Sequence, residues 1–379
     1  MIALSWPQVS ARRLERAGLG AEPARTGPAE VVAAMCGAHA QVMSAAEVSV
    51  GLRLAGATRA HVRAALRPGG ELVKTYGPRG TVHVLPARDL GAWVSALSSL
   101  PVGRNPHAPS VRLTPEQTER VVAAITEAVA ADELTIDELS DRVVDLAGPW
   151  AGDLVMPAFG GNWPRWRQAM HLAAHRGAFV FGAGRGRKVT YTAPPAVPPT
   201  AAPAEDGLGE LVRGYLTAYG PATPEQFAQW AGGPVRWAAG AFERAGVEEV
   251  LFEGRPAWVV AGDTAAPEEP PRGVRLLPYF DAYVVAGRPR ELLYPGAAAA
   301  RALNRGQAGN FPVLLVDGVV AGVWHQRRSG DRLDVTVEPL HELGPERERE
   351  LEEQVERLGE VLEARPRLTI GTVTVGAHA

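Results

Sequence analysis

The chain has a single cysteine, Cys36, among its 379 residues. One cysteine excludes an internal disulfide bond and any metal site built from several thiolates. Lysine is nearly absent as well, because Lys74 and Lys188 stand against 37 arginines. No run of about 18 apolar residues occurs, and the first residues show no charged leader followed by a long apolar run. We therefore expect a cytoplasmic protein without a membrane span, in which Cys36 is a small buried apolar residue.

Acidic residues are missing from one long stretch of the chain. Between Leu154 and Ala204 there is none, while six basic residues occur there. Residues 1–100 carry 11 basic and 6 acidic side chains, whereas residues 201–379 carry 18 basic and 26 acidic ones. The net charge of −3 hides this asymmetry. A polyanion is expected to approach the two basic parts of the chain.

A short stretch between two predicted helices carries the first candidate functional residues. The run 28–36 has a helical pattern that Gly37 closes, because glycine adopts a positive φ without strain. Ser44-Ala-Ala-Glu47 has the capping-box pattern and predicts the start of the next helix. His39 and Gln41 lie between them, so an extended segment would direct both side chains to one side. Two solvated loop side chains are the simpler interpretation of the same pair.

The same order of elements, helices followed by two strands, occurs three times. In the first copy the predicted helices are 3–16, 29–36, 45–55 and 58–66. In the second copy one helix starts at Thr114, one starts at Thr135 and one spans 165–176. In the third copy one helix spans 208–218, one starts at Thr223 and one spans 235–244. The predicted strands are 71–75 and 81–85, then 178–181 and 189–192, then 247–252 and 257–260. This order is typical of winged helix-turn-helix units, in which a helix enters the major groove and the hairpin contacts the backbone or minor groove.

The last part of the chain has a different pattern. Short strands are predicted over 274–277, 312–324, 333–337 and 368–375, with Asp317-Gly318 as a hairpin turn and one charged amphipathic helix over 346–363. These strands predict a small antiparallel β-barrel. The predicted fold class is α+β, with three tandem winged-helix units followed by this barrel. The expected domains are 1–108, which includes the catalytic stretch, 109–200, 205–262 and 263–379, with an extended proline-rich linker over 194–203.

Four segments in this order resemble the winged-helix DNA glycosylases of the AlkZ/YcaQ type. They are Cys36-Gly-Ala-His-Ala-Gln41, Arg79-Gly-Thr-Val-His83-Val-Leu-Pro86, Leu277-Pro-Tyr-Phe-Asp281-Ala-Tyr-Val-Val285 and Val316-Asp-Gly-Val-Val-Ala-Gly-Val-Trp324. The resemblance covers nearly the full length. It implies excision of alkylated purines from double-stranded DNA by three winged helices and a β-barrel around a DNA channel, and base excision repair in a bacterium. Repair of interstrand crosslinks, and protection of a producer from its own genotoxin, both stay open.

The resemblance also implies the catalytic residues. The family's motif has two polar residues separated by one apolar residue, usually Gln-x-Gln or Gln-x-Asp, directly after the first helix. Here the motif is His-x-Gln, so His39 and Gln41 are the expected catalytic pair. Such a pair can suffice, because an N7-alkylated guanine is already cationic and leaves C1′ through an oxocarbenium-like transition state. Gln41 would orient a water, and a neutral His39 would also accept a proton.

Other residues are weaker candidates. His83 and Asp281 are possible active-site neighbours, although a core histidine and a turn-capping aspartate are equally open interpretations. The residues expected to bind DNA are Lys74, Arg79, Arg165, Arg167, Arg185, Arg187 and Lys188. His171 and His175 have the i, i+4 spacing of a metal pair, but no third ligand is apparent, so we expect no metal and no cofactor.

Lysine is absent near His39 and Gln41, which argues against a Schiff-base lyase step and predicts a monofunctional DNA glycosylase that leaves an abasic site. We expect a monomer that acts on damaged duplex DNA without an obligate protein partner. The main alternative is a non-catalytic winged-helix DNA-binding protein, such as a transcriptional regulator.

Overall fold

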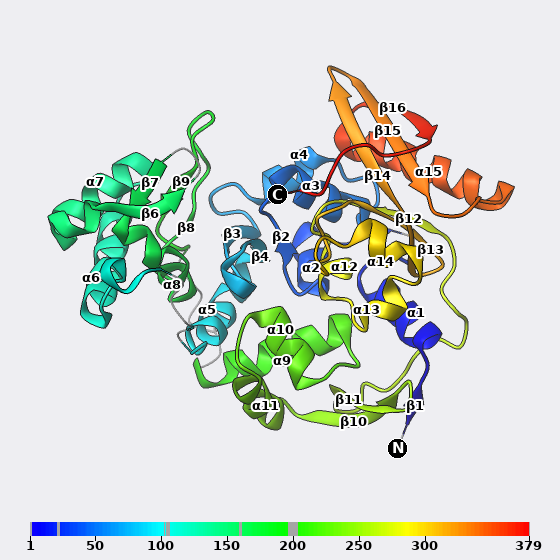
Figure 1. Ribbon diagram of the computed structural model, residues 1–379, viewed down its shortest axis with the longest axis horizontal. Coiled ribbons are helices and arrows are strands. Elements are labelled where there is room, and N and C mark those ends of the chain that lie inside the picture. The colour runs from blue at the N-terminus through cyan, green and yellow to red at the C-terminus, as the bar shows by residue number, and fades with distance from the viewer. Residues whose placement is uncertain are drawn as a thin grey trace.

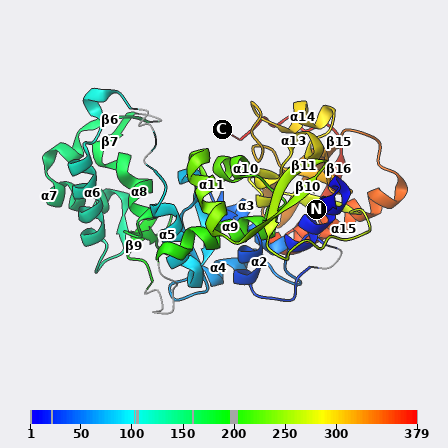
Figure 2. The ribbon, with the colours of Figure 1, turned by 90° about the horizontal axis from the view of Figure 1, so that it is seen from below.

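The computed structural model describes residues 2–20, 23–101, 103, 107–158, 161–195 and 204–378. The described residues between 109 and 195 form a lobe at one side of a larger body, and the C-terminal sheet lies on the far side of that body (Figure 1, Figure 2). The α+β class is confirmed. No helix within the described ranges has the length and apolar character needed to cross a membrane.

The first segment contains the predicted hairpin. Its elements are β1 (Ala3–Leu4), α1 (Trp6–Arg16), α2 (Pro28–Ala34), β2 (Ala38–His39), α3 (Met43–Leu52), α4 (Arg59–Ala65), β3 (Leu72–Tyr76), β4 (Val82–Pro86) and α5 (Leu90–Ser98). β2 adds an edge to the hairpin, so the sheet order is β2-β4-β3. Thr58 caps α4 through a capping box with His61. The predicted helices and hairpin therefore form, with differences at two helix starts, whereas β2 and α5 were not predicted.

Those two starts differ because tertiary contacts prevail over local pattern. Residues 3 and 4 form β1, which pairs in parallel with the distant strand β10 (Val247–Phe252), so α1 begins only at Trp6. α3 begins at Met43 with Val42 as N-cap, so the predicted capping box of Ser44 and Glu47 does not form. Glu47 instead forms an ion pair with Arg63 at 2.7 Å. A side chain that can cap a helix thus serves to join two helices.

The second segment forms the lobe. Its elements are α6 (Pro115–Ala128), β5 (Leu134–Thr135), α7 (Ile136–Ala147), β6 (Leu154–Ala158), β7 (Gly161–Pro164), α8 (Met170–His175), β8 (Val180–Phe181) and β9 (Thr190–Thr192). Thr114 and Thr135 cap α6 and α7 as predicted, by accepting hydrogen bonds from backbone N–H groups. The predicted helix over 165–176 begins as a 3₁₀ turn over Arg165–Ala169. The hairpin β6–β7 was not predicted.

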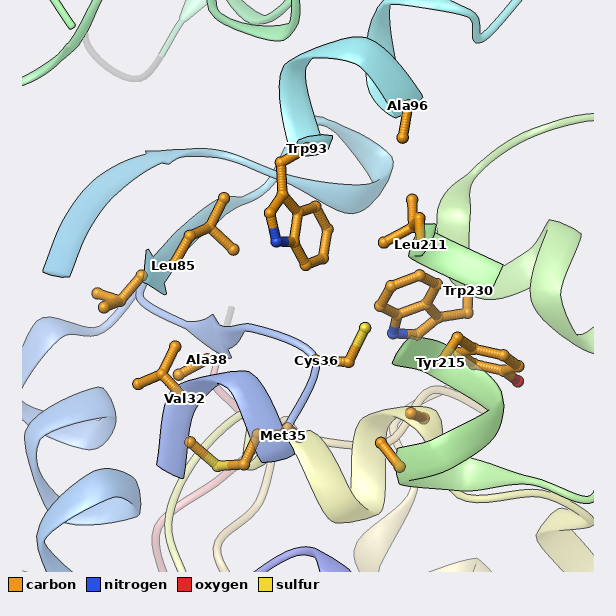
Figure 3. Close-up of a cluster of buried hydrophobic side chains, with 14 of the residues drawn as sticks. Val32, Met35, Cys36, Ala38, Leu85, Trp93, Ala96, Leu211, Tyr215 and Trp230 are labelled. Carbon is orange, nitrogen blue, oxygen red and sulfur yellow. The ribbon is translucent and has the colours of Figure 1, made fainter. Parts of the chain in front are cut away.

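The third segment shares its core with the first. Its elements are α9 (Ala204–Tyr219), α10 (Pro224–Ala231), α11 (Val235–Arg244), β10 and β11 (Arg255–Val260). Figure 3 shows Trp93 of the first segment facing Leu211 and Trp230 of the third, with Cys36 beside Trp230. Burial raises the pKa of the Cys36 thiol, so the interpretation of Cys36 as a small apolar residue is confirmed. The predicted linker over 194–203 lies mostly outside the described residues.

The C-terminal segment is an open, curled sheet rather than a closed barrel. Its strands are β12 (Val274–Leu277), β13 (Val313–Val316), β14 (Val319–Ser329), β15 (Arg332–Pro339) and β16 (Arg365–Ile370), paired in that order. Its helices are α12 (Ala282–Ala286), α13 (Arg290–Leu293), α14 (Ala297–Ala302) and α15 (Pro345–Leu362). The predicted closure is wrong, because β12 and β16 remain at opposite edges and β16 pairs in parallel with β15. The turn at Asp317-Gly318 is confirmed, with φ of 50° and 82°.

A buried ion pair joins the first segment to this C-terminal one. Arg53 of α3 donates two hydrogen bonds to Asp281, each at 2.9 Å, and both side chains are fully buried. Ser49 donates a further hydrogen bond to the same carboxylate at 2.6 Å. Removing one partner of such a pair leaves a buried charge without compensation. Asp281 therefore holds the stretch around Phe280 against α3.

We expect Asp281→Ala to lower the free energy of unfolding by about 3–5 kcal/mol, because Arg53 would remain buried without its partner. Urea unfolding followed by tryptophan fluorescence measures the change. Glu30→Ala, which removes an exposed ion pair with Arg88, is the matched control and should change stability little. Equal stability of Asp281→Ala and the parent would show that this pair does not join the two segments.

Candidate active site

The stretch that carries His39 begins at a tight helix end. Cys36 and Gly37 both have a positive φ, 50° and 88°, after the last turn of α2. The Gly37 N–H donates to the Val32 carbonyl at 3.0 Å and the Cys36 N–H to the Ala33 carbonyl at 2.9 Å, which is the Schellman pattern. A Cβ at Gly37 would lie 3.0 Å from Leu85. The chain therefore turns sharply and enters β2 directly.

His39 lies in β2, directly opposite His83 of β4. The two imidazole rings are 4.1 Å apart between centroids, and His39 is only 7% exposed. His83 is buried too, and its Nδ1 lies 2.9 Å from the Thr81 carbonyl, to which it donates. The structure thus brings together two of the histidines that the sequence singled out.

Arg79 reaches His39 from the turn between β3 and β4. Arg79 has a left-handed conformation, with φ of 58°, and its guanidinium donates to the carbonyl of Trp230 in α10. The second guanidinium nitrogen lies 3.3 Å from Nε2 of His39. Arginine has donors and no acceptor, so Nε2 must offer its lone pair and the proton must lie on Nδ1. Within the described ranges, this Nδ1 is buried and has no hydrogen-bond partner.

Both histidines are neutral. Burial, followed by the charges of His83 and Arg79, places the pKa of His39 well below 6.5. Burial is also the main cause that lowers the pKa of His83 to about 3. A histidine in this setting can accept a hydrogen bond at one nitrogen and donate one at the other, but it does not carry a charge near pH 7.

Gln41 differs from His39 in its exposure. Its side chain is exposed, whereas the ring of His39 is buried, so the interpretation of the pair as two solvated loop side chains is wrong for His39. The reason is that only Ala38 and His39 are extended and paired with β4, and the chain bends at Gln41. Gln41 therefore stands at the surface next to a buried histidine.

Aromatic side chains from the C-terminal segment complete the surroundings of His39. Phe280 lies 6.5 Å from His39 between ring centroids and has a left-handed φ of 55°. His378 lies 5.4 Å from the rings of both Tyr279 and Phe280. Phe280 lies within a segment that carries the family resemblance, but nothing in the sequence pointed to His378. Asp281 itself caps α12 by accepting the Tyr283 N–H at 3.0 Å, and lies in the buried pair described above.

The basic residues of the lobe are mostly paired. Arg165 contacts Asp153 at 3.0 Å, Arg185 contacts Glu138 at 2.7 Å, and Lys188 contacts Asp137 at 3.3 Å. The sequence stretch without acidic residues is therefore neutralised by acids that precede it in the chain. Arg187 is exposed and forms no ion pair within the described ranges.

Two other cations lie over aromatic rings. Arg167 lies 4.0 Å from the ring of Trp163, and Lys74 lies 4.7 Å from that of Phe181. Arg12 and Arg13 of α1 are buried, so the N-terminal basic charge reaches the surface only in part. Residues 1–100 and the stretch between Leu154 and Ala204 therefore have less unpaired positive charge at the surface than their sequences suggest.

His171 and His175 lie together but their geometry is not that of a metal site. Their rings meet edge to face at 5.9 Å between centroids, and Nε2 of His175 donates to the Gly77 carbonyl at 2.9 Å. Among the residues that the structure describes, no group of three or more His, Cys, Asp or Glu side chains could hold a metal ion. His175 supports the turn that carries Arg79.

Comparison with known proteins places the chain among DNA glycosylases. A family model described as DNA glycosylase AlkZ-like matches residues 32–361, which include His39, Arg79 and Phe280. A protein described as interstrand DNA cross-link repair glycosylase, from Streptomyces sahachiroi, is 31% identical over 344 residues, covering 84% of this chain and 87% of its own. The solved structure of Streptomyces sahachiroi DNA glycosylase AlkZ superposes with a TM-score of 0.80 at 28% identity, covering 98% of this chain and 100% of that chain.

The contact between Arg79 and His39 predicts a fixed tautomer. In ¹⁵N-labelled protein, His39 should show a protonated Nδ1 and an unprotonated Nε2, with no titration between about pH 5 and 8. In Arg79→Ala, Nε2 loses its donor and the two tautomers should exchange. Arg176→Ala, which removes an exposed ion pair with Glu119, is the control and should leave the His39 signals in place. A protonated Nε2 in the parent would contradict the assignment.

Proposed function

The chain belongs to the AlkZ-like DNA glycosylase family, and from this premise we propose that it hydrolyses the N-glycosidic bond of alkylated purines in double-stranded DNA and leaves an abasic site. The observation that carries the proposal is that the family match spans the stretch with His39 and Gln41, next to Arg79 and Phe280. N7-alkylguanine is the primary substrate in this proposal, with N3-alkyladenine and interstrand crosslinks as further substrates. The name of the Streptomyces sahachiroi relative supports the crosslink as a test substrate.

The proposed domains follow the sequence boundaries, 1–108, 109–200, 205–262 and 263–379. We interpret the first three as tandem winged helices, because each contains helices followed by an antiparallel pair of strands. Each unit then offers a helix and a hairpin to duplex DNA. The segment between β12 and α12 supplies Phe280.

In the proposed reaction, the bond between C1′ and the purine nitrogen breaks and its electron pair leaves with the base. An N7-alkylated guanine thereby becomes neutral, so the base itself needs little protonation. The exposed carboxamide of Gln41 orients a water against C1′, where positive charge develops. The water oxygen bonds to C1′, and its proton passes to Nε2 of His39 or to solvent. For His39 to accept it, Arg79 must release Nε2 to the water.

Neither lysine has a recorded contact with His39 or Gln41 in the described structure. Lys74 lies over Phe181, and Lys188 is paired with Asp137. This supports the proposal of a monofunctional enzyme, since a lyase step needs an amine that attacks C1′. We place His39 and Gln41 in the catalytic role and His83 and Asp281 in supporting positions. Arg79, Arg167, Arg187 and Lys74 are the proposed DNA contacts, together with Arg165, Arg185 and Lys188 once their acidic partners are displaced.

We expect His39→Ala and Gln41→Ala each to reduce the single-turnover excision of N7-methylguanine by about 10²-fold or more, because each removes a group that holds the attacking water. Alkali-induced strand cleavage measures the abasic product. Ser44→Ala changes an exposed neighbour on the same stretch and should retain the parent's rate. Unchanged rates in both variants would refute the mechanism, and a parent that binds DNA but releases no alkylated base would favour a regulator.

The low pKa of His39 predicts how the rate depends on pH. Since burial keeps the imidazole neutral well below pH 6.5, excision should show no inflection near pH 6.5 as the pH falls from about 8 to 5.5. Single-turnover rates across this range test the expectation. An inflection near pH 6.5 in the parent that disappears in His39→Gln would mean that His39 titrates as an ordinary exposed histidine.

A further inference from the structure

Four arginines beside the candidate active site have no carboxylate partner among the residues that the structure describes. Arg13 comes from α1, Arg79 from the β3–β4 turn, and Arg288 and Arg290 from the chain around the start of α13. Their hydrogen bonds go to backbone carbonyls, to one amide side chain and to His39. None of the ion pairs between described residues includes any of the four.

The four side chains are close to one another. Arg79 donates to the carbonyl of Trp230, and Arg288 donates to the side chain of the preceding residue, Gln229, at 2.7 Å. Both therefore lie at the C-terminal end of α10. Arg13 donates to the backbone carbonyl of Arg288. These bonds link α1, the turn and the chain before α13 at one place.

The charges of these arginines repel each other. Burial lowers the pKa of Arg79, and the charge of Arg288 lowers it further. Burial lowers the pKa of Arg290 to about 10, and the charges of Arg288 and Arg79 contribute. Glu291 is the acidic residue whose charge acts on Arg288 in the opposite sense, but the two form no ion pair in the described structure. Positive charge in a partly buried place is therefore left uncompensated, a situation that a bound anion relieves.

Part of this group faces solvent. Arg79 and Gln229 are exposed, so the bond from Arg288 to Gln229 lies at the surface. Arg79 also lines a cavity of about 520 Å³ with Gly80, Gly232 and Arg167. One terminal nitrogen of the Arg288 guanidinium, Nη1, is buried and has no hydrogen-bond partner in the described structure. Arg13 and Arg290 are occupied by backbone carbonyls and hold the others in place.

We propose that Arg79 and Arg288 form a binding site for one phosphodiester of the DNA strand, with Arg13 and Arg290 as supports. Guanidinium groups match the oxygens of a phosphate in geometry and charge. In this site the phosphate replaces the Gln229 oxygen as the acceptor for Arg288. Because Arg79 also contacts His39, a phosphate bound here places the adjacent sugar near the catalytic pair. The choice of DNA as the source of the phosphate rests on the proposed function.

The test is the affinity for an undamaged duplex at several salt concentrations, measured by fluorescence anisotropy with full-length protein. Arg288→Gln should weaken binding about tenfold at moderate salt. It should also reduce the slope of log K against log salt by about 0.9, the amount expected for one lost phosphate contact. Arg288→Lys should restore most of the slope but not all of the affinity, because lysine keeps the charge and loses the planar fork.

Arg176→Gln is the matched control, since it removes an arginine that already has an acidic partner, Glu119, and has no proposed role in DNA binding, and it should change the slope less than Arg288→Gln does. In one outcome, inorganic phosphate binds to the parent and not to Arg288→Gln while both proteins show the same salt slope for DNA. That result would overturn the assignment of the site to DNA. An unchanged slope and affinity in a folded Arg288→Gln variant would overturn the site altogether. The duplex in this test is undamaged, so the result does not depend on excision. A reduced slope therefore supports the phosphate site even if the excision assay shows that the parent releases no base.

Discussion

The contact on which the candidate site depends is that of the Arg79 guanidinium with two acceptors, the carbonyl of Trp230 and Nε2 of His39. It connects three parts of the chain that are far apart in sequence. The turn adopts a left-handed conformation at Arg79, and α10 approaches so closely that a Cβ at Gly232 would lie 3.0 Å from the Arg79 backbone. His175 supports the same turn through the Gly77 carbonyl. The state of His39 is thus set by the packing of the first and third segments.

The basic side chains of the lobe and those next to His39 differ in the groups that they contact. In the lobe, Arg185 and Lys188 are matched by acids of α7, and exposed pairs of this kind contribute little to stability and are readily exchanged for another anion. At the centre, Arg79 and Arg288 lie at the end of α10 and donate to neutral acceptors, namely a carbonyl, Nε2 of His39 and an amide oxygen. Carbonyls satisfy the geometry of a guanidinium without cancelling its charge. Positive charge without a carboxylate partner in the described structure therefore also lies next to His39, although the sequence places its longest acid-free stretch elsewhere.

Local patterns predicted the local structure well. The caps at Thr114, Thr135 and Thr223 and the turn at Asp317 are confirmed, because each depends on residues within a few positions of one another. Contacts between distant residues were beyond such patterns. The capping box at Ser44 gave way to a tertiary ion pair of Glu47, and the sheet failed to close because β16 pairs in parallel with β15. For the candidate site, the sequence identified His39, His83 and Arg79 but not their mutual contact.

In the proposed mechanism, a fixed tautomer lets His39 take the place of the glutamine that the resemblance to the family implies at this position. Glutamine offers one acceptor and two donors on a planar, uncharged group. A neutral imidazole with its proton held on Nδ1 offers one acceptor and one donor, also on a planar, uncharged group. Protonation would remove the acceptor and add a positive charge beside a developing oxocarbenium ion, which opposes the reaction. Burial and Arg79 together keep His39 neutral until the water attacks C1′, so in this proposal His39 supplies the same kind of chemistry as a glutamine.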